Sequence, residues 1–201
     1  VLFRSISLDL IFALPETLQR DWDADLEQAV ALEPDPLSLY GLTVEPQTPL
    51  GRWTARGEVL EAPEERYADE YLAAHQRLAD AGFEHYEVSN FARPGRQSRH
   101  NSAYWKRVPY RGLGPSAHSF DGTHRRWNVP EYERWRGLLA SGASAEAGFE
   151  ALTEANRIAE EVYLGLRTSE GLEVSADELP EVGRWVEAGW GVLDGMRLRL
   201  S

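Results

Sequence analysis

Three side chains within five residues could together bind a ligand. His100, Asn101 and Tyr104 bring together an imidazole, an amide and a phenol. An imidazole nitrogen is a common ligand of haem iron, and a neighbouring amide and phenol can orient it or bind the propionates. The surrounding cations suit carboxylates; they are Arg96, Arg99, Lys106 and Arg107. The alternative is an ordinary solvated histidine, because the spacing of a lone imidazole does not define a haem site.

Asp9 is the second candidate, because it interrupts the apolar run from Ser7 to Leu14. A carboxylate in a buried strand is costly unless it is paired or faces a site. One interpretation is a structural aspartate bound to an arginine or to backbone amides. The other is a ligand-binding carboxylate at the mouth of an α/β barrel, where it would accept hydrogen bonds from a ribose or an amine.

The third candidate is the segment from Gly112 to His118, which contains the sequence Gly-Leu-Gly. Glycines allow a backbone to approach a ligand closely. The full spacing of a dinucleotide-binding loop is missing, so a tight structural turn explains the glycines equally well. The sequence contains no Walker loop, no G-x-S-x-G elbow and no H-E-x-x-H motif.

Charge is unevenly spread along the 201 residues. The net charge is −12, yet residues 83–128 carry eight Lys/Arg, three acids and four of the five histidines. This stretch would favour an anionic ligand, or it is a solvated loop that pairs with acidic helices of the same protein. The overall acidity argues against a general nucleic-acid or anionic-membrane surface. Without cysteine, this chain can supply no disulfide and no thiolate ligand to an iron–sulfur cluster. With no apolar stretch long enough to cross a membrane and no signal-peptide pattern, we expect a cytoplasmic protein.

The elements that position these residues alternate between strands and helices up to residue 91. Strands buried on both faces are predicted for 7–14 and 37–43, and a third strand for 83–91. Thr17 is expected to cap the first helix and Pro63 to begin the second. Strands that alternate with helices in this order are typical of parallel βαβ units. Each of these two helices is predicted to place one set of residues on a single face. The sets are Trp22, Leu26 and Val30 in the first helix, and Tyr67, Tyr71, His75 and Leu78 in the second.

Beyond Pro94 the pattern changes. Residues 94–128 have no clear period and are predicted to be irregular and rich in loops. Helices are expected over 152–167, capped by Thr153, and over 178–188, followed by a hairpin over 192–198 that turns at Asp-Gly. This arrangement suggests a small winged-helix-like unit. Residues 1–5 resemble a translated sequencing adapter, so we expect native sequence to begin near Ile6 in what is part of a longer protein.

Several collinear motifs resemble the oxygen-independent coproporphyrinogen III oxidase family of radical S-adenosylmethionine (SAM) proteins. The similarity extends over essentially residues 6–201, and its H-N-x-x-Y and Y-E-x-S-N-F-A elements are similar to those of HemW-type haem chaperones within that family. The matching segments are Asp9–Pro15, Leu39–Pro46, Tyr86–Gly95, His100–Trp105, Gly112–Ser119, Leu164–Thr168 and Gly171–Leu172.

The resemblance implies a fold and a set of contacts. The fold class would be α/β, with residues 6–128 forming the C-terminal part of a partial (β/α) radical-SAM barrel plus a loop-rich haem-motif region. Residues 129–201 would form a helical, winged-helix-like C-terminal domain. The implied cofactors are SAM, a [4Fe–4S] cluster in the longer parent protein, and haem. The implied residues are Asp9 for SAM, more weakly Thr43 and His118 near the cofactor cavity, and His100, Asn101 and Tyr104 for haem, with His100 toward the iron.

The resemblance also implies a function, with departures that leave alternatives open. A HemW-type protein binds haem and hands it to haem-accepting respiratory proteins, through which it would associate peripherally with a membrane. The alternative is an enzyme that oxidatively decarboxylates coproporphyrinogen III, and a third interpretation is a protein-docking module formed by the C-terminal helices and hairpin. The cluster-binding C-x-x-x-C-x-x-C loop is absent, so radical chemistry is not expected of this chain alone. Position 13 is Ala where the family usually has Gly, a change that we expect a strand to tolerate.

Overall fold

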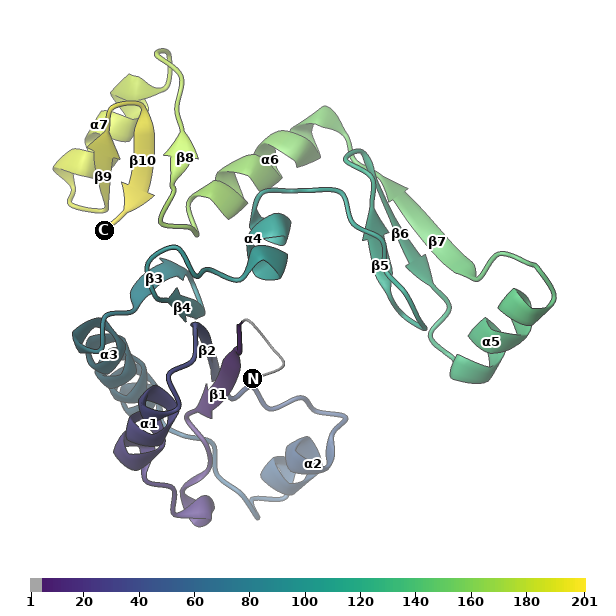
Figure 1. Cartoon of the computed structure of the whole chain (residues 1–201), viewed down its shortest axis with the longest axis horizontal. Coiled ribbons are helices and arrows are strands. Elements are labelled where there is room, and N and C mark those ends of the chain that lie inside the picture. Colours follow the sequence, from purple (N-terminus) through teal and green to yellow (C-terminus); the bar gives the residue numbers. More distant parts are fainter. Residues whose placement is uncertain (1–4) are drawn as a thin grey trace. The chain divides into compact units, whose positions relative to one another are not determined.

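The computed structural model describes residues 5–201 and divides into two compact units between Ser98 and Arg99 (Figure 1). Each unit is described by itself. Residues 1–4 of the adapter-like stretch lie outside the described part. The predicted division at 128/129 falls between two strands that pair with each other, at Asn128 and Glu146. The assignment of 6–128 and 129–201 to two family domains stays a prediction.

The first unit contains a four-stranded mixed sheet in the order β1-β2-β4-β3. The first two strands are parallel, as predicted, and the other pairings are antiparallel. The prediction of one strand over 83–91 is wrong, because the chain folds back at Val88 and Ser89 into a hairpin. The carbonyl of Ser89 there accepts a hydrogen bond of 2.7 Å from the N–H of Leu39. The strands are β1 (Leu8–Phe12), β2 (Pro36–Gly41), β3 (Glu84–Glu87) and β4 (Asn90–Ala92).

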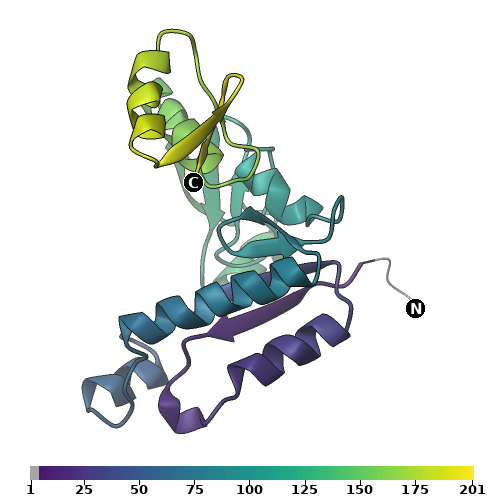
Figure 2. The same cartoon turned by 90° about the vertical axis from the view of Figure 1, so that its left-hand side faces the viewer.

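Helices α1 and α3 lie side by side over one face of this sheet (Figure 2). The predicted cap Thr17 lies instead in a short 3-10 helix, and the N-cap of α1 is Asp21, whose carboxylate accepts from the N–H of Ala24 at 3.0 Å. Pro63 is the N-cap of α3, and a helix that was not predicted, α2, lies in the preceding segment. The bounds are η1 (Glu16–Leu18), α1 (Trp22–Ala31), α2 (Pro49–Ala55) and α3 (Glu64–Asp80).

The two faces of the sheet differ in polarity because side chains alternate along a strand. Leu8, Leu10 and Phe12 of β1 pack into the core beneath the helices, whereas Asp9 and Ile11 point to the other face and are exposed. The expectation that β1 is buried on both faces is therefore wrong. The fully buried members of the core include Leu26, Leu37, Leu39, Leu78 and Phe91.

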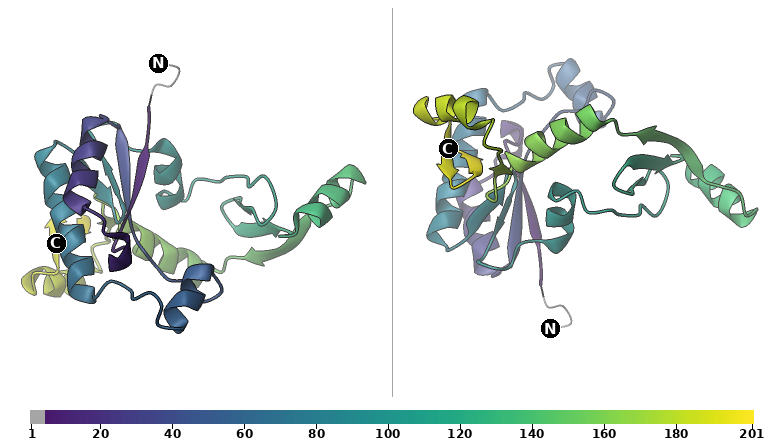
Figure 3. Two further views of the ribbon diagram at one scale, coloured as in Figure 1. Left: turned by 90° about the horizontal axis from the view of Figure 1, so that it is seen from below. Right: turned by 90° about the horizontal axis from the view of Figure 1, so that it is seen from above.

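The second unit begins with a helix and a three-stranded antiparallel sheet, so the prediction of irregular structure over 94–128 is wrong in part. The sheet order is β5-β6-β7, and α5 lies at one end of the ribbon formed by the last two strands (Figure 3). These strands are stabilised by pairing with one another within residues 118–151. Because strand formation here depends on such partners, the local sequence shows little periodicity. The elements are α4 (Arg99–Trp105), β5 (His118–Phe120), β6 (His124–Asn128), α5 (Tyr132–Ala140) and β7 (Glu146–Ala151).

The last third of the chain agrees with the sequence prediction. Thr153 caps α6 in a capping box with Asn156. The predicted hairpin forms and gains a third strand, which gives the order β8-β10-β9. Its small core contains Val174, Val182 and Leu198. The elements are α6 (Glu154–Gly165), β8 (Leu172–Glu173), α7 (Leu179–Glu187), β9 (Gly191–Asp194) and β10 (Arg197–Leu200).

Candidate functional site

The H-N-x-x-Y element forms α4, which places two of its three candidate residues on one helical face. His100 and Tyr104 are four residues apart, and their rings meet edge to face with centroids 5.0 Å apart. Both side chains are exposed, and Asn101 lies beside them in the same helix. Among residues 5–201 no hydrogen-bond partner occupies the imidazole of His100. The ring therefore has a nitrogen available to a ligand.

Tyr104 also contacts the rest of the second unit. Its ring lies edge to face against Tyr110, with centroids 4.7 Å apart. Tyr110 is held in turn by two backbone hydrogen bonds to Phe120, of 2.8 and 2.9 Å. The aromatic contacts thus connect α4 to strand β5 and restrict the orientation of the phenol.

Most cations of the basic stretch are paired with acids, which confirms that alternative for the residues concerned. Lys106 pairs with Glu170 at 2.5 Å, and Arg125 pairs with Glu160 at 2.6 Å. Arg107 lies 3.7 Å from Glu160. Arg126 pairs with Asp121 at 2.7 Å, and Arg96 lies 3.9 Å from Asp35. Arg99 begins α4, is exposed and forms no ion pair among the described residues.

Asp9 lies on the face of the first unit's sheet that is turned away from the core beneath α1 and α3. Its carboxylate is exposed and forms no hydrogen bond or ion pair with the described residues. Its neighbour in register on β2 is Ser38, and the neighbour of Ser38 on β4 is Asn90. Three strands therefore bring a row of polar residues onto one face of the sheet.

A buried polar network that was not predicted from the sequence lies beside Asp9. The hydroxyl of Ser38 donates to the Asn90 amide oxygen at 2.7 Å, and the Asn90 amide nitrogen donates to Glu87. Glu87 is only 3% exposed, and its burial raises the pKa of its carboxyl, although hydrogen bonds from Asn90 and Ser89 oppose the shift. The only signal in the sequence was the Y-E-x-S-N run, where a glutamate and an asparagine interrupt apolar residues.

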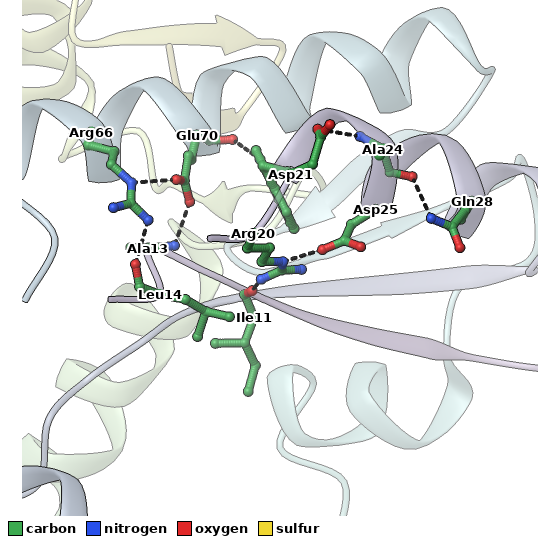
Figure 4. Close-up of polar contacts among 11 residues, drawn as sticks. Ile11, Ala13, Leu14, Arg20, Asp21, Ala24, Asp25, Gln28, Arg66 and Glu70 are labelled. Atoms are coloured by element: carbon green, nitrogen blue, oxygen red, sulfur yellow. Dashed lines mark hydrogen bonds and ion pairs between the residues drawn. The ribbon is translucent and has the colours of Figure 1, made fainter. Parts of the chain in front are cut away.

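The carboxyl end of β1 is tied to both helices by side chains (Figure 4). Glu70 of α3 accepts from the N–H of Ala13 and from Arg66, each at 2.7 Å. Arg66 also donates to the carbonyl of Leu14, and Arg20 donates to the carbonyl of Ile11. Backbone groups that a neighbouring strand would otherwise pair are therefore satisfied by α3 and by the segment before α1.

Ala13 differs from the expectation based on its sequence position. It follows the last residue of β1, and its φ is +57°. Side chains with a Cβ are disfavoured in this left-handed region, which glycine adopts freely. The usual glycine of the family therefore matches the backbone here, and alanine is strained rather than simply tolerated within a strand.

The two weaker SAM candidates lie in different units. Thr43 follows the end of β2, where the N–H of Leu42 donates to the carbonyl of Phe12 at 2.9 Å, so Thr43 lies near the carboxyl ends of both parallel strands. His118 begins β5 in the second unit, with its ring centroid 5.9 Å from that of Trp127. The structure brings Asp9 and Thr43 into one unit and the α4 residues and His118 into the other.

The residues present differ in how well they fit the implied cofactors. A cysteine-held cluster has no thiolate ligand in this sequence, so no step through such a cluster is derived for this chain. Across residues 5–201 no three His, Asp or Glu side chains gather as a metal site. An exposed imidazole next to a phenol fits an axial haem contact. No helix within these residues has the length and apolarity needed to span a bilayer.

Comparisons with known proteins agree on one family. The chain is 40% identical over 187 residues to the heme chaperone HemW of Synechocystis, which covers 90% of this chain and 44% of that protein. It is 37% identical over 173 residues to the heme chaperone HemW of Mycobacterium tuberculosis, covering 86% of this chain and 44% of that protein. No family model matches the chain. The chain thus spans less than half the length of these relatives.

A solved structure shows the same fold. Coproporphyrinogen III oxidase (HemN) from Escherichia coli, a radical SAM enzyme, superposes with a TM-score of 0.71 over 99% of this chain and 52% of that one, at 20% identity. The mixed α/β architecture described above is therefore part of a radical SAM fold. Over the part that it spans, the chain is thus similar in sequence to the HemW heme chaperones and has the fold of the radical SAM enzyme HemN.

Proposed function

We propose that this chain contributes a haem-binding element to a haem chaperone, with His100 of α4 toward the iron. The observation that carries the proposal is the pairing of an exposed, unoccupied imidazole with Tyr104 on one helical face, at 5.0 Å between ring centroids. The HemW names of relatives that are 37–40% identical support this function. Asn101, in the same helix, would orient the imidazole or bind a propionate.

The proposal includes SAM on the first unit. Asp9 would accept hydrogen bonds from the ribose or amine of SAM, since its carboxylate is exposed and unpaired among the described residues. Thr43, after β2 in the same unit, is a weaker candidate contact of this cofactor. SAM would supply radical chemistry only together with a [4Fe–4S] cluster, whose ligands would have to come from outside this chain.

The partners and location are also part of this proposal. A chaperone releases its haem to acceptor proteins, and we propose haem-containing respiratory proteins as the acceptors. Its location would be cytoplasmic, with peripheral membrane association through those acceptors. Oxidative decarboxylation of coproporphyrinogen III is the alternative activity, but only the fold, at 20% identity, points toward it.

A haemin titration tests the proposal. The 201-residue chain is expected to shift the Soret band of haemin, and His100→Ala should weaken binding and alter the band by removing an axial ligand. His124→Ala is a matched control, because His124 is a partly exposed histidine of the same unit that lies next to Asp121. Equal titrations of the wild type and His100→Ala would remove His100 from the site.

A further inference from the structure

The second unit contains a groove that the α4 assignment does not use. It lies between the loop 109–114, the sheet strands β5 and β6, and helix α5, and its volume is about 1120 Å³. That volume is slightly larger than that of most small-molecule sites, which are typically about 300–1,000 Å³. The large apolar side chains that line it are Tyr110, Leu113, Phe120, Trp135 and Leu139. A groove of this size and lining fits a large, flat, largely apolar ligand.

The Gly-Leu-Gly sequence shapes one wall of this groove. Gly112 packs directly on the neighbouring strand, since a Cβ there would lie 2.2 Å from the carbonyl oxygen of His118. Gly114 has a φ of +109°, which favours glycine. Between them Leu113 is 86% exposed. The two glycines therefore act as a structural turn that holds an apolar side chain at the edge of the groove.

The groove also has one uncompensated cation. Arg126 is neutralised by Asp121 at 2.7 Å and by Glu146 at 3.6 Å. Arg111, two residues from Leu113, forms no ion pair with any residue in 5–201 and lines the groove. A guanidinium in this setting can bind a carboxylate through two parallel hydrogen bonds. The preferred ligand is therefore an apolar molecule that carries an acidic group.

One residue of the groove lining contacts the α4 element. Tyr110 lines the groove, and its ring also contacts that of Tyr104 at 4.7 Å between centroids. Tyr104 in turn contacts His100. Two ring-to-ring contacts therefore separate the groove lining from the imidazole assigned to haem.

We propose that this groove binds the macrocycle of a carboxylated tetrapyrrole, with Leu113 and Trp135 against the ring and Arg111 on a carboxylate. The inference rests on the proposed function, because it supplies a seat for the macrocycle beside the α4 element. Binding in the groove differs from the α4 assignment in the contacts that it requires. The ligand needs only apolar surface and a carboxylate, and it does not need an iron atom that a histidine can ligate.

Iron-free protoporphyrin IX is the probe that separates the two assignments. We expect saturable binding to the 201-residue chain, followed by porphyrin fluorescence, with Leu113→Ser weakening it about tenfold. Arg111→Ala should weaken it about threefold, as for a partly exposed ion pair. The dimethyl ester of the porphyrin should bind the wild type and Arg111→Ala equally. His124→Ala, at a histidine that does not line the groove, should leave binding of the iron-free porphyrin unchanged.

Matched controls are Leu60→Ser and Arg134→Ala, which change exposed residues outside the groove. All the substituted side chains are exposed, so far-ultraviolet circular dichroism should show the wild-type fold. Absence of saturable porphyrin binding, or wild-type affinity in both groove variants, overturns the groove assignment and leaves the haemin test of His100 standing. A second outcome separates the two assignments. If Leu113→Ser weakens porphyrin binding while His100→Ala leaves the haemin titration unchanged, the groove assignment is supported and the α4 assignment is overturned.

Discussion

The carboxylate of Glu70 accepts a hydrogen bond from the backbone N–H of Ala13, at 2.7 Å and across 57 residues of sequence. The same carboxylate accepts from Arg66, which also donates to the carbonyl of Leu14. Side chains of α3 therefore hold the backbone of the two residues that follow β1, Ala13 and Leu14 (Figure 4). Because the carboxyl ends of β1 and β2 lie side by side, this contact also fixes the edge near Thr43.

Replacing Glu70 should destabilise the first unit. Glu70→Ala leaves a partly buried N–H and a guanidinium without their acceptor, so we expect the free energy of unfolding to fall by about 1–3 kcal/mol. Glu70→Gln retains an acceptor for Ala13 and should lose less. Urea unfolding measures both, with the exposed Asp69→Ala as the control on the same helix. Equal stability of wild type and Glu70→Ala would show that the contact contributes nothing.

Ala13→Gly should stabilise the chain, although glycine usually does the opposite. The positive φ of Ala13 costs an L-residue about 1–2 kcal/mol, whereas the added backbone entropy of glycine costs about 0.5–1 kcal/mol. The expected gain in the free energy of unfolding is about 0.5 kcal/mol. Ala73→Gly, at an exposed position within α3, should instead lower it by about 1 kcal/mol. A loss of similar size at both positions would contradict the strain at residue 13.

Glu87 should make stability depend on pH. Its folded-state pKa is raised above the ordinary 4.5 by burial, so the folded state holds a proton that the unfolded state releases. The stability that this proton supports is fully present below pH 4.5 and is lost as the pH rises through the folded-state pKa. Glu87→Gln should remove this dependence, as measured by unfolding curves across pH 4–8. Parallel pH profiles of wild type and variant would mean that Glu87 does not carry it.

Two glycine substitutions in the second unit should have opposite effects. Gly112→Ala places a Cβ 2.2 Å from a backbone oxygen of His118, which cannot move without disrupting β5. We expect a loss of about 1–3 kcal/mol from such overpacking. Gly137, in α5, has open space around its Cβ position, so Gly137→Ala should gain about 0.5–1 kcal/mol from helix propensity. Thermal unfolding of both variants checks the pair, and a harmless Gly112→Ala would contradict the close packing.

Local signals predicted the elements that depend on nearby residues. The β1-α1-β2 unit, the cap at Thr153, helices α6 and α7 and the final hairpin all follow from apolar periodicity and capping or turn residues that act within a few positions. The proximity of His100 and Tyr104 also follows from the sequence once the helix forms, because residues at i and i+4 share a helical face.

Long-range pairing decided the rest, and no local pattern encodes it. The segment 83–91 has the aromatic and β-branched residues of a strand, yet it folds back, and the carbonyl of Ser89 bonds to Leu39, fifty residues earlier in the chain. The strands within 118–128 likewise depend on partners that are distant in sequence, and the positive φ of Ala13 depends on backbone geometry.

The sequence by itself determined the family, the chemical types at Asp9 and His100, and the absence of cysteine ligands, since these are properties of residue identity and short spacing. Only the tertiary structure decided that Asp9 faces outward beside a buried Ser38–Asn90–Glu87 network, and that a groove opens next to Tyr104. Burial and adjacency arise when segments far apart in the chain pack together. They set the cost of a buried carboxyl and the shape of a binding surface.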